Sequence, residues 1–163
     1  MMVKLRIAND NDKELYRNMF NMYHNDISPY NNDFLEIDGN GYFEKDAIDC
    51  YFDGNESVKP YIIAFNNKTA GCIVLSRPPF VKPGCDYCIQ ELFLLGLYRG
   101  KGIAESACLY LMKEYKGRYC IIILKENHRA MSFWRKLIAK NAVFISEEEL
   151  DEKSIALEFL TKQ

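Results

Sequence analysis

Histidine, long apolar runs and an excess of one charge are all scarce in this sequence of 163 residues. Only His24 and His128 are present, so the HExxH motif of zinc hydrolases is absent, and we expect no metal site. No apolar run approaches the roughly 20 residues that a membrane-spanning helix needs. The first nine residues also lack the apolar stretch and cleavage site of a secretory signal peptide. We therefore expect a cytoplasmic protein with no membrane partner.

The charge balance is close to neutral. The chain has 21 Lys and Arg residues and 23 Asp and Glu residues, for a formal net charge of −2. Its 48% apolar and 27% charged residues are typical of a globular domain and argue against a disordered, collagen-like or coiled-coil chain. A dedicated nucleic-acid-binding protein should carry a strongly basic face, so we expect no nucleic-acid partner. The length suits one domain.

Six cysteines are spread along the chain without the spacing of a small secreted disulfide scaffold. We interpret them as reduced, mostly buried thiols. Cys85 and Cys88 form a lone Cys-x-x-Cys motif, whereas a zinc site would need a second such motif or a histidine pair. A redox motif would open a helix, but this one lies between a Pro-Gly turn and an expected strand. We therefore expect neither a zinc site nor a redox function for Cys85 and Cys88.

The first half of the chain predicts a strand, two helices and a hairpin. A short alternating stretch predicts a strand near residues 5–7, and helical spacing predicts a helix that Asp10 or Asp12 caps. Residues 25–40 are rich in turn residues and predict a surface loop. A second short helix is expected at residues 47–52. Apolar runs at 61–65 and 71–75, separated by Asn66-Asn67-Lys68, predict a hairpin.

The second half alternates strands and helices. We expect a strand at residues 88–95, a helix at 100–115 and an apolar strand at 119–124 of the kind buried on both faces. Asn127 can cap a further helix, and short strands are expected near residues 142–145 and 154–159. The pattern predicts a mixed α/β fold with a central sheet.

The turn Arg99-Gly100-Lys101-Gly102-Ile103-Ala104 joins an expected strand to an expected helix. Glycines let the backbone approach a ligand closely, and the first N–H groups of a helix have no partner within it. Together with the positive end of the helix dipole, these groups suit a phosphate. The alternative is a glycine-containing turn with no ligand. The segment is neither a Walker loop nor a full GxGxxG motif.

This same turn resembles the acetyl-CoA signature of the GNAT N-acetyltransferase superfamily, Arg/Gln-x-x-Gly-x-Gly/Ala. A second block, Asn127-His128-Arg129-Ala130-Met131-Ser132-Phe133-Trp134-Arg135-Lys136, is similar to the family's Asn-x-x-Ala-x-x-Phe-Tyr/Trp-x-Lys helix. The two blocks lie within residues 88–136. Ser28-Pro29-Tyr30, Pro60-Tyr61 and Ala70-Gly71 also resemble an uncharacterised branch of predicted acetyltransferases.

The resemblance implies a mostly antiparallel central sheet of six to seven strands, flanked by about four helices, with splayed fourth and fifth strands. It implies one domain over residues 1–163: an acceptor-side half at 1–87, an acetyl-CoA-binding core at 88–140 and C-terminal strands at 141–163. Pantetheine would lie in the gap between the splayed strands, and the pyrophosphate would lie on the amides of the glycine turn. The implied cofactor-binding residues are Phe93, Leu94, Leu95, Arg99, Gly100, Lys101, Gly102, Ile103, Ala104, Asn127, Phe133 and Trp134.

Acyl transfer to an amine needs a neutral amine. Keeping a lysine-like amine with a pKa near 10.4 neutral at pH 7 costs about 4.6 kcal/mol. A carboxylate or water relay that accepts the proton offsets part of this cost. Glu91 is the candidate base, because by strand alternation it shares a face with Phe93 and Leu95. The alternative is that Glu91 is a polar residue in a structural hydrogen bond.

Trp134 departs from the family pattern, since many members have a tyrosine there that protonates the departing thiolate. An indole N–H is only a hydrogen-bond donor, so water, Tyr30 or Tyr98 would have to serve as the acid. A thiol pKa of about 8.5 makes the thiolate a tolerable leaving group without much help. Plain core packing is the alternative for Phe133 and Trp134.

The leading hypothesis is an N-acetyltransferase that moves an acetyl group from coenzyme A to an amine of a small molecule or protein, as a monomer or homodimer. The alternative is a non-catalytic acyl-CoA-binding or regulatory module. Ten basic and three acidic residues lie between positions 99 and 140, so the rest of the chain is acidic. This separation suits an anionic cofactor at one end of a cleft and a cationic amine at the other. Aromatic and acidic residues that could line the amine site are Tyr23, Asp26, Tyr30, Asp33 and Tyr42.

Overall fold

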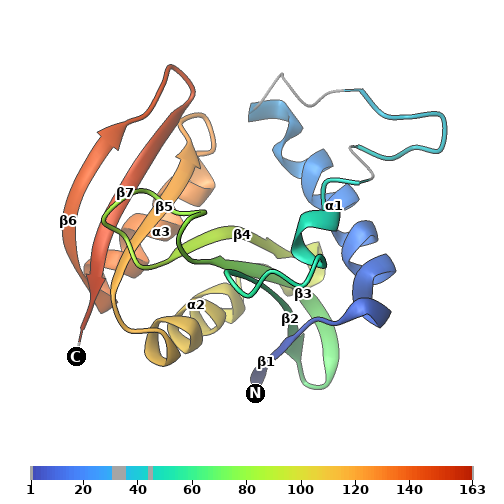
Figure 1. Cartoon of the computed structure of the whole chain (residues 1–163), viewed down its shortest axis with the longest axis horizontal. Helices are drawn as coiled ribbons and strands as arrows, with labels where there is room; N and C mark the ends of the chain where they lie inside the picture. Colours follow the sequence, from blue (N-terminus) through green and yellow to red (C-terminus); the bar gives the residue numbers. More distant parts are fainter. Residues whose placement is uncertain (1, 31–35, 44–45, 163) are drawn as a thin grey trace.

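The computed structural model describes residues 2–30, 36–43 and 46–162, and within them the strands form two antiparallel sheets (Figure 1). The first sheet has the order β1-β2-β3-β4 and the second has the order β5-β7-β6. The strands are β1 (Val3–Ile7), β2 (Val58–Phe65), β3 (Lys68–Ser76), β4 (Cys88–Leu94), β5 (Arg118–Leu124), β6 (Ala142–Glu149) and β7 (Ser154–Thr161). The helices are α1 (Lys13–Ile27), α2 (Ile103–Glu114) and α3 (His128–Asn141). The mixed α/β fold with seven strands is as predicted.

The hairpin of β2 and β3 forms at the predicted place. Asn66 and Asn67 have φ values of +50° and +63°, and Phe65 pairs with Lys68 across them. Two successive residues with positive φ make the kind of turn that matches the twist of the flanking strands. Further along β3, Gly71 lies so close to β4 that a Cβ atom there would be 2.0 Å from the Phe93 carbonyl oxygen. Glycine at this position therefore allows the two strands to approach where β4 ends.

Helix α1 begins at Lys13, directly after Asp12, which is one of the two capping positions that the sequence predicted. The Asp12 side chain makes no cap hydrogen bond to α1, whereas Asn9 caps the preceding 3₁₀ turn η1 (Asp10–Asp12), where its side chain accepts the Asn11 N–H at 3.0 Å. Asp12 instead accepts the Asn9 N–H at 3.0 Å and pairs with Arg6 at 2.6 Å. The expected second helix is a single 3₁₀ turn, η4 (Asp49–Tyr51), so the described residues contain three α-helices where about four were expected.

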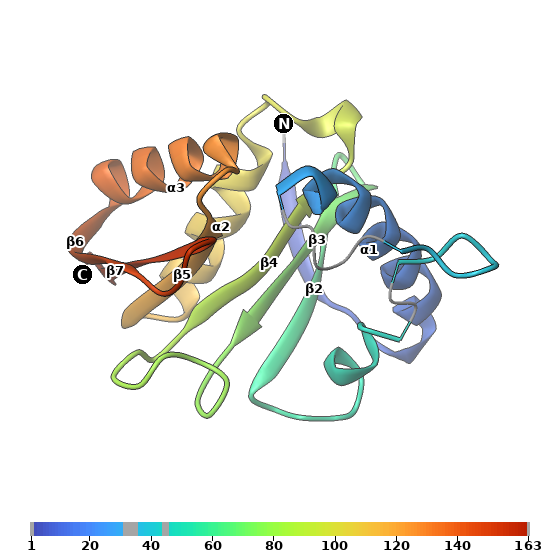
Figure 2. The same ribbon diagram turned by 90° about the horizontal axis from the view of Figure 1, so that it is seen from above.

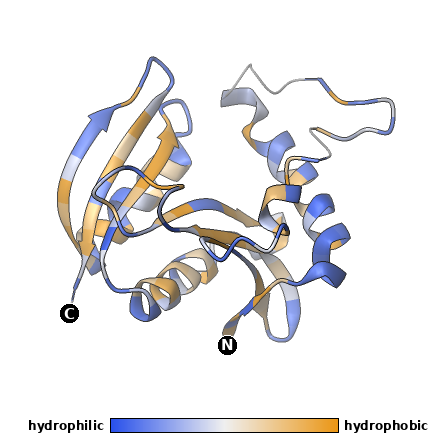
Figure 3. Cartoon of the chain, viewed as in Figure 1, coloured by the Kyte–Doolittle hydropathy of each residue, from blue (hydrophilic) through white to orange (hydrophobic). Residues whose placement is uncertain are grey.

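Helices α1 and α2 cover opposite faces of the first sheet (Figure 2). Tyr16, Met19 and Phe20 of α1 pack on one face with Ile62 and Val74. Leu111 and Met112 of α2 pack on the other face, in a larger core that also includes the inner face of the second sheet. The hydropathy colouring shows apolar residues along β3 to β5 and on α2 (Figure 3). None of the described helices is long and apolar enough to cross a membrane.

The two sheets meet at one point and then separate. Tyr87 and Tyr119 form a parallel bridge, and the Cys120 N–H donates to the Tyr87 carbonyl at 3.0 Å. In the described part of the chain no ladder joins β4 to β5 beyond this bridge. The prediction that β5 is buried on both faces is wrong at Ile122, which is 57% exposed. Since β4 diverges from β5, it leaves that side chain uncovered.

All six cysteines are free and five of them are buried, as predicted; Cys50 is exposed. Among the described residues, no group of three or more His, Cys, Asp or Glu side chains is arranged to hold a metal ion.

Candidate active site

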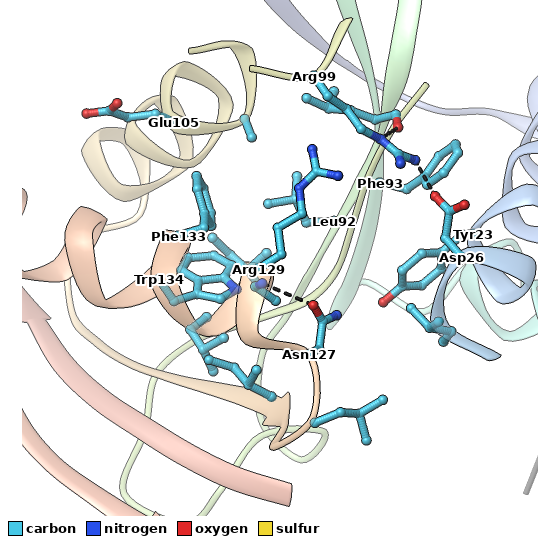
Figure 4. Close-up of a pocket in the computed structure, with 18 of the residues that line it drawn as sticks. Tyr23, Asp26, Leu92, Phe93, Arg99, Glu105, Asn127, Arg129, Phe133 and Trp134 are labelled. Atoms are coloured by element: carbon cyan, nitrogen blue, oxygen red, sulfur yellow. Dashed lines mark hydrogen bonds and ion pairs between the residues drawn. The ribbon is translucent and has the colours of Figure 1, made fainter. Parts of the chain in front are cut away.

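The separation of β4 from β5 opens a cavity of about 660 Å³ (Figure 4). Its walls come from α1, β4, the turn before α2, the end of β5 and the first turns of α3. Residues that line it include Tyr23, Asp26, Tyr30, Gln90, Leu92, Phe93, Leu94, Arg99, Gly100, Gly102, Ile103, Ala104, Ile122, Asn127, Arg129, Phe133 and Trp134. The cavity thus brings together segments from both halves of the chain.

The glycine turn presents unpaired backbone N–H groups at one end of the cavity. The first N–H that bonds back is that of Ser106, to the Gly102 carbonyl at 3.0 Å. Within the described residues, the N–H groups of residues 100–105 donate to no protein acceptor. Gly100 and Gly102 have φ values of +72° and +74°, and a Cβ at either would meet nothing within 4 Å. Glycine is therefore required here by the backbone conformation, which leaves room for a ligand in front of the turn.

Arg99 links this turn to both β4 and α1. Its Nε donates to the Leu94 carbonyl at 2.7 Å, and its guanidinium lies 5.5 Å from the centre of the Phe93 ring. A terminal nitrogen pairs with Asp26 of α1 (Figure 4). The Nε hydrogen bond holds the side chain against β4, while the terminal nitrogens of the guanidinium lie in the cavity wall.

Helix α3 supplies the opposite wall. The Asn127 side chain accepts the Ala130 N–H at 3.1 Å and so caps the helix, as the sequence predicted. Phe133 and Trp134 pack edge to face with ring centres 5.1 Å apart, and both line the cavity. Trp134 is 5% exposed and belongs to the larger core, so a core role and a lining role hold together.

Glu91 lies behind the cavity wall. It shares a face of β4 with Phe93, as alternation predicted, and that face packs against α1. The Tyr51 hydroxyl donates to Glu91 Oε1 at 3.4 Å, and the Tyr23 hydroxyl also hydrogen-bonds to this carboxylate. Burial raises the pKa of Glu91 to about 7, although the two tyrosine hydrogen bonds oppose the shift. Tyr23 lines the cavity and Glu91 does not, so the tyrosine separates the carboxylate from the cavity.

Besides Glu91, three of the predicted site residues lie away from the cavity lining. Tyr98 ends the 3₁₀ turn η5 (Gly96–Tyr98) and packs against Phe65 of β2, with ring centres 6.1 Å apart. Leu95 packs toward α1, and the Lys101 side chain is exposed. The position of Tyr98 gives no support to its role as an acid, whereas Tyr30 does line the cavity.

On the acceptor side, the structure brings Tyr23, Asp26 and Tyr30 to the cavity. Tyr42 is not among its lining residues, and Asp33 lies outside the described residues. Sequence reasoning missed Arg129, an exposed cation in the cavity wall, and the contact of Tyr23 with Glu91. Tyr23 was expected among the residues that could line the amine site, but nothing in the local sequence pattern indicates its contact with Glu91.

Comparisons with known proteins agree with this geometry. The model of the acetyltransferase (GNAT) family matches residues 19–138. A crystal structure of histone acetyltransferase HPA2 and related acetyltransferase from Corynebacterium glutamicum has a TM-score of 0.70 at 11% identity, over 100% of this chain and 98% of that one. An acetyltransferase from Thermus thermophilus has a TM-score of 0.69 at 13% identity, over 97% and 96%.

A GNAT-family acetyltransferase from Streptococcus agalactiae has a TM-score of 0.67 at 13% identity, over 99% of this chain and 96% of that one. At these identities the structural matches establish the fold alone, and no curated protein matches the sequence. The family model, in contrast, spans well over half of the chain and includes both the glycine turn and the Asn127 helix. The chain therefore belongs to the GNAT acetyltransferase family.

Proposed function

We propose that this protein is an acetyl-CoA-dependent N-acetyltransferase that transfers the acetyl group directly to an amine of a small molecule or protein. One observation carries the proposal. A single cavity is lined both by the glycine turn, with its unpaired N–H groups, and by Tyr23, which hydrogen-bonds to the Glu91 carboxylate with its pKa near 7. GNAT acetyltransferases act in general by acyl transfer, and this cavity fits both an anionic cofactor and an amine.

The residues present fit coenzyme A. The N–H groups of residues 100–105 and the Arg99 guanidinium offer donors to a pyrophosphate. The backbone of Phe93, Leu94 and Leu95 follows the edge of β4 that faces the gap, where a pantetheine amide can pair. Phe133 and Trp134 supply an apolar wall opposite that edge. Bound acetyl-CoA would supply a thioester carbonyl, from which an amine nitrogen displaces the thiol.

Tyr23 and Glu91 are placed to accept the proton of the amine. A carboxylate whose pKa is near 7 is partly ionised at neutral pH and is a stronger base than an ordinary glutamate. Because Tyr23 lies between Glu91 and the cavity, the proton would pass through its hydroxyl or a water molecule. Trp134 cannot protonate the departing thiolate, and a thiol pKa of about 8.5 makes that step tolerable without it.

The test is to measure thiol release from acetyl-CoA with a panel of small amines and lysine-containing peptides, beside calorimetric titration with coenzyme A. We expect coenzyme A to bind and at least one amine to be acetylated at its nitrogen. Absence of coenzyme A binding at millimolar concentration would contradict both this proposal and the next.

A second candidate is a non-catalytic acyl-CoA-binding module. The placement of Glu91 behind Tyr23 and the presence of Trp134 where many relatives have tyrosine favour it. Such a module would bind coenzyme A through the same turn, yet release no thiol with any amine. The two assays together distinguish the candidates.

A further inference from the structure

Asp26 and Arg99 form an ion pair in the wall of the cavity. Asp26 lies in the last turns of α1, and Arg99 begins the glycine turn. Their side chains are 38% and 28% exposed. Among the described residues, the lining has one other acidic residue, Glu105, which pairs with Lys140 at 3.0 Å. Within the described lining, Asp26 is thus the carboxylate that becomes available to a ligand when Arg99 changes partner.

The Arg99 guanidinium can exchange its contact with Asp26 for another anion while the rest of the side chain stays in place. Its Nε bond to the Leu94 carbonyl and its contact with the Phe93 ring do not involve the terminal nitrogen that pairs with Asp26. The backbone of Arg99 leads directly into the unpaired N–H groups of the turn, where we propose that the pyrophosphate binds. A diphosphate has more charge than one carboxylate and offers the planar guanidinium paired oxygens, so it competes strongly for that nitrogen.

A bound diphosphate would leave Asp26 without its cation and close to a second anion. A carboxylate in that position attracts a positively charged ligand group. Tyr23 and Asp26 are three residues apart on α1, so they lie side by side on one face of the helix, and both line the cavity. An amine at Tyr23 would place a second ammonium group, a few methylene carbons away, at Asp26.

We propose that Asp26 recognises a second positive charge on the acceptor, and that the cofactor pyrophosphate exposes this carboxylate by taking Arg99 from it. The acceptor class is then a dicationic amine such as a short linear diamine. This inference rests on the proposed function for its kinetic test and on coenzyme A binding alone for its equilibrium test.

The kinetic test compares kcat/KM for 1,4-diaminobutane with kcat/KM for n-butylamine. We expect the wild-type protein to favour the diamine by about tenfold, as a charged hydrogen bond supports. Asp26→Asn should abolish this preference. Glu14→Gln is the matched control, because Glu14 is an exposed carboxylate of the same helix outside the cavity lining, and it should keep the wild-type ratio.

The equilibrium test titrates 1,4-diaminobutane by calorimetry, with and without saturating coenzyme A. We expect about tenfold tighter diamine binding with coenzyme A in the wild-type protein and no such gain in Asp26→Asn. Coenzyme A itself should bind Asp26→Asn at least as tightly as wild type, since its competitor for Arg99 is gone. If Asp26 only positions Arg99, coenzyme A should instead bind the variant more weakly.

An equal preference for the two amines, or weaker coenzyme A binding by Asp26→Asn, would overturn the inference while leaving the proposed function standing. If coenzyme A binds but no amine of the wider panel reacts, the proposed function fails, and the calorimetric comparison still decides the role of Asp26.

Discussion

Replacement of Glu91 by glutamine removes a partly buried carboxylate that lies between β4 and α1 and accepts hydrogen bonds from Tyr23 and Tyr51. Burial raises its pKa from an ordinary 4.5 to about 7, which corresponds to about 3 kcal/mol of free energy. The folded state therefore prefers the protonated form. The stability that this preference provides is complete below about pH 4.5, declines as the pH rises toward 7, and is absent above that pH.

Glutamine stays neutral at every pH, so Glu91→Gln should become steadily more stable relative to wild type between pH 4.5 and 7. We expect the difference in the free energy of unfolding to grow by about 3 kcal/mol over that range and then to level off. Urea unfolding at half-unit pH intervals measures it. Glu56→Gln, which changes an exposed carboxylate, should leave the wild-type profile nearly unchanged. Parallel profiles for wild type and Glu91→Gln would refute the buried state of this carboxylate.

The same variant separates the two roles of Glu91. As a base, Glu91 gives a rise in kcat/KM through about pH 7 that should be lost in Glu91→Gln, together with at least tenfold of the rate. If the stability difference appears while turnover at every pH is unchanged, Glu91 is a structural residue.

Three further predictions concern the turn, a cap and the aromatic wall. Gly102→Ala, at φ +74°, should cost about 1 kcal/mol of stability and weaken coenzyme A binding at least tenfold by calorimetry. The matched control Gly54→Ala, at φ +82° in an exposed loop, should cost about the same stability without affecting binding. Asp12→Asn should lower the free energy of unfolding by about 2 kcal/mol at pH 7. This deficit should vanish as the pH falls toward 2, because the bond from Arg6 holds the pKa of Asp12 at about 2; a deficit that persists there would contradict this reasoning. Trp134→Tyr should change kcat by less than about threefold if the thiolate leaves unassisted, and a tenfold rise would show that a missing acid limits the rate.

The local elements were predictable because their signals lie within a few residues. Asn66 and Asn67 predict a hairpin turn at their own position, and Asn127 predicts the start of α3 from its own side chain. The sequence predicted Asp12 as a cap of α1, but its side chain pairs with Arg6 on a neighbouring strand and makes no cap hydrogen bond to the helix. That competition depends on β1 lying beside the helix entry and is not visible in the local pattern.

The sequence alone determined the α/β class, the order of the elements, the glycine turn that opens α2 and the face of β4 on which Glu91 lies, because each depends on short-range periodicity or on the backbone freedom of particular residues. The tertiary structure decided which of these features share one cavity. It brought Tyr23 and Asp26 of α1 to a gap between strands more than 60 residues later, and it turned Tyr98 away from that gap. These placements follow from how the two sheets separate beyond Tyr87 and Tyr119, and that depends on packing across the whole chain.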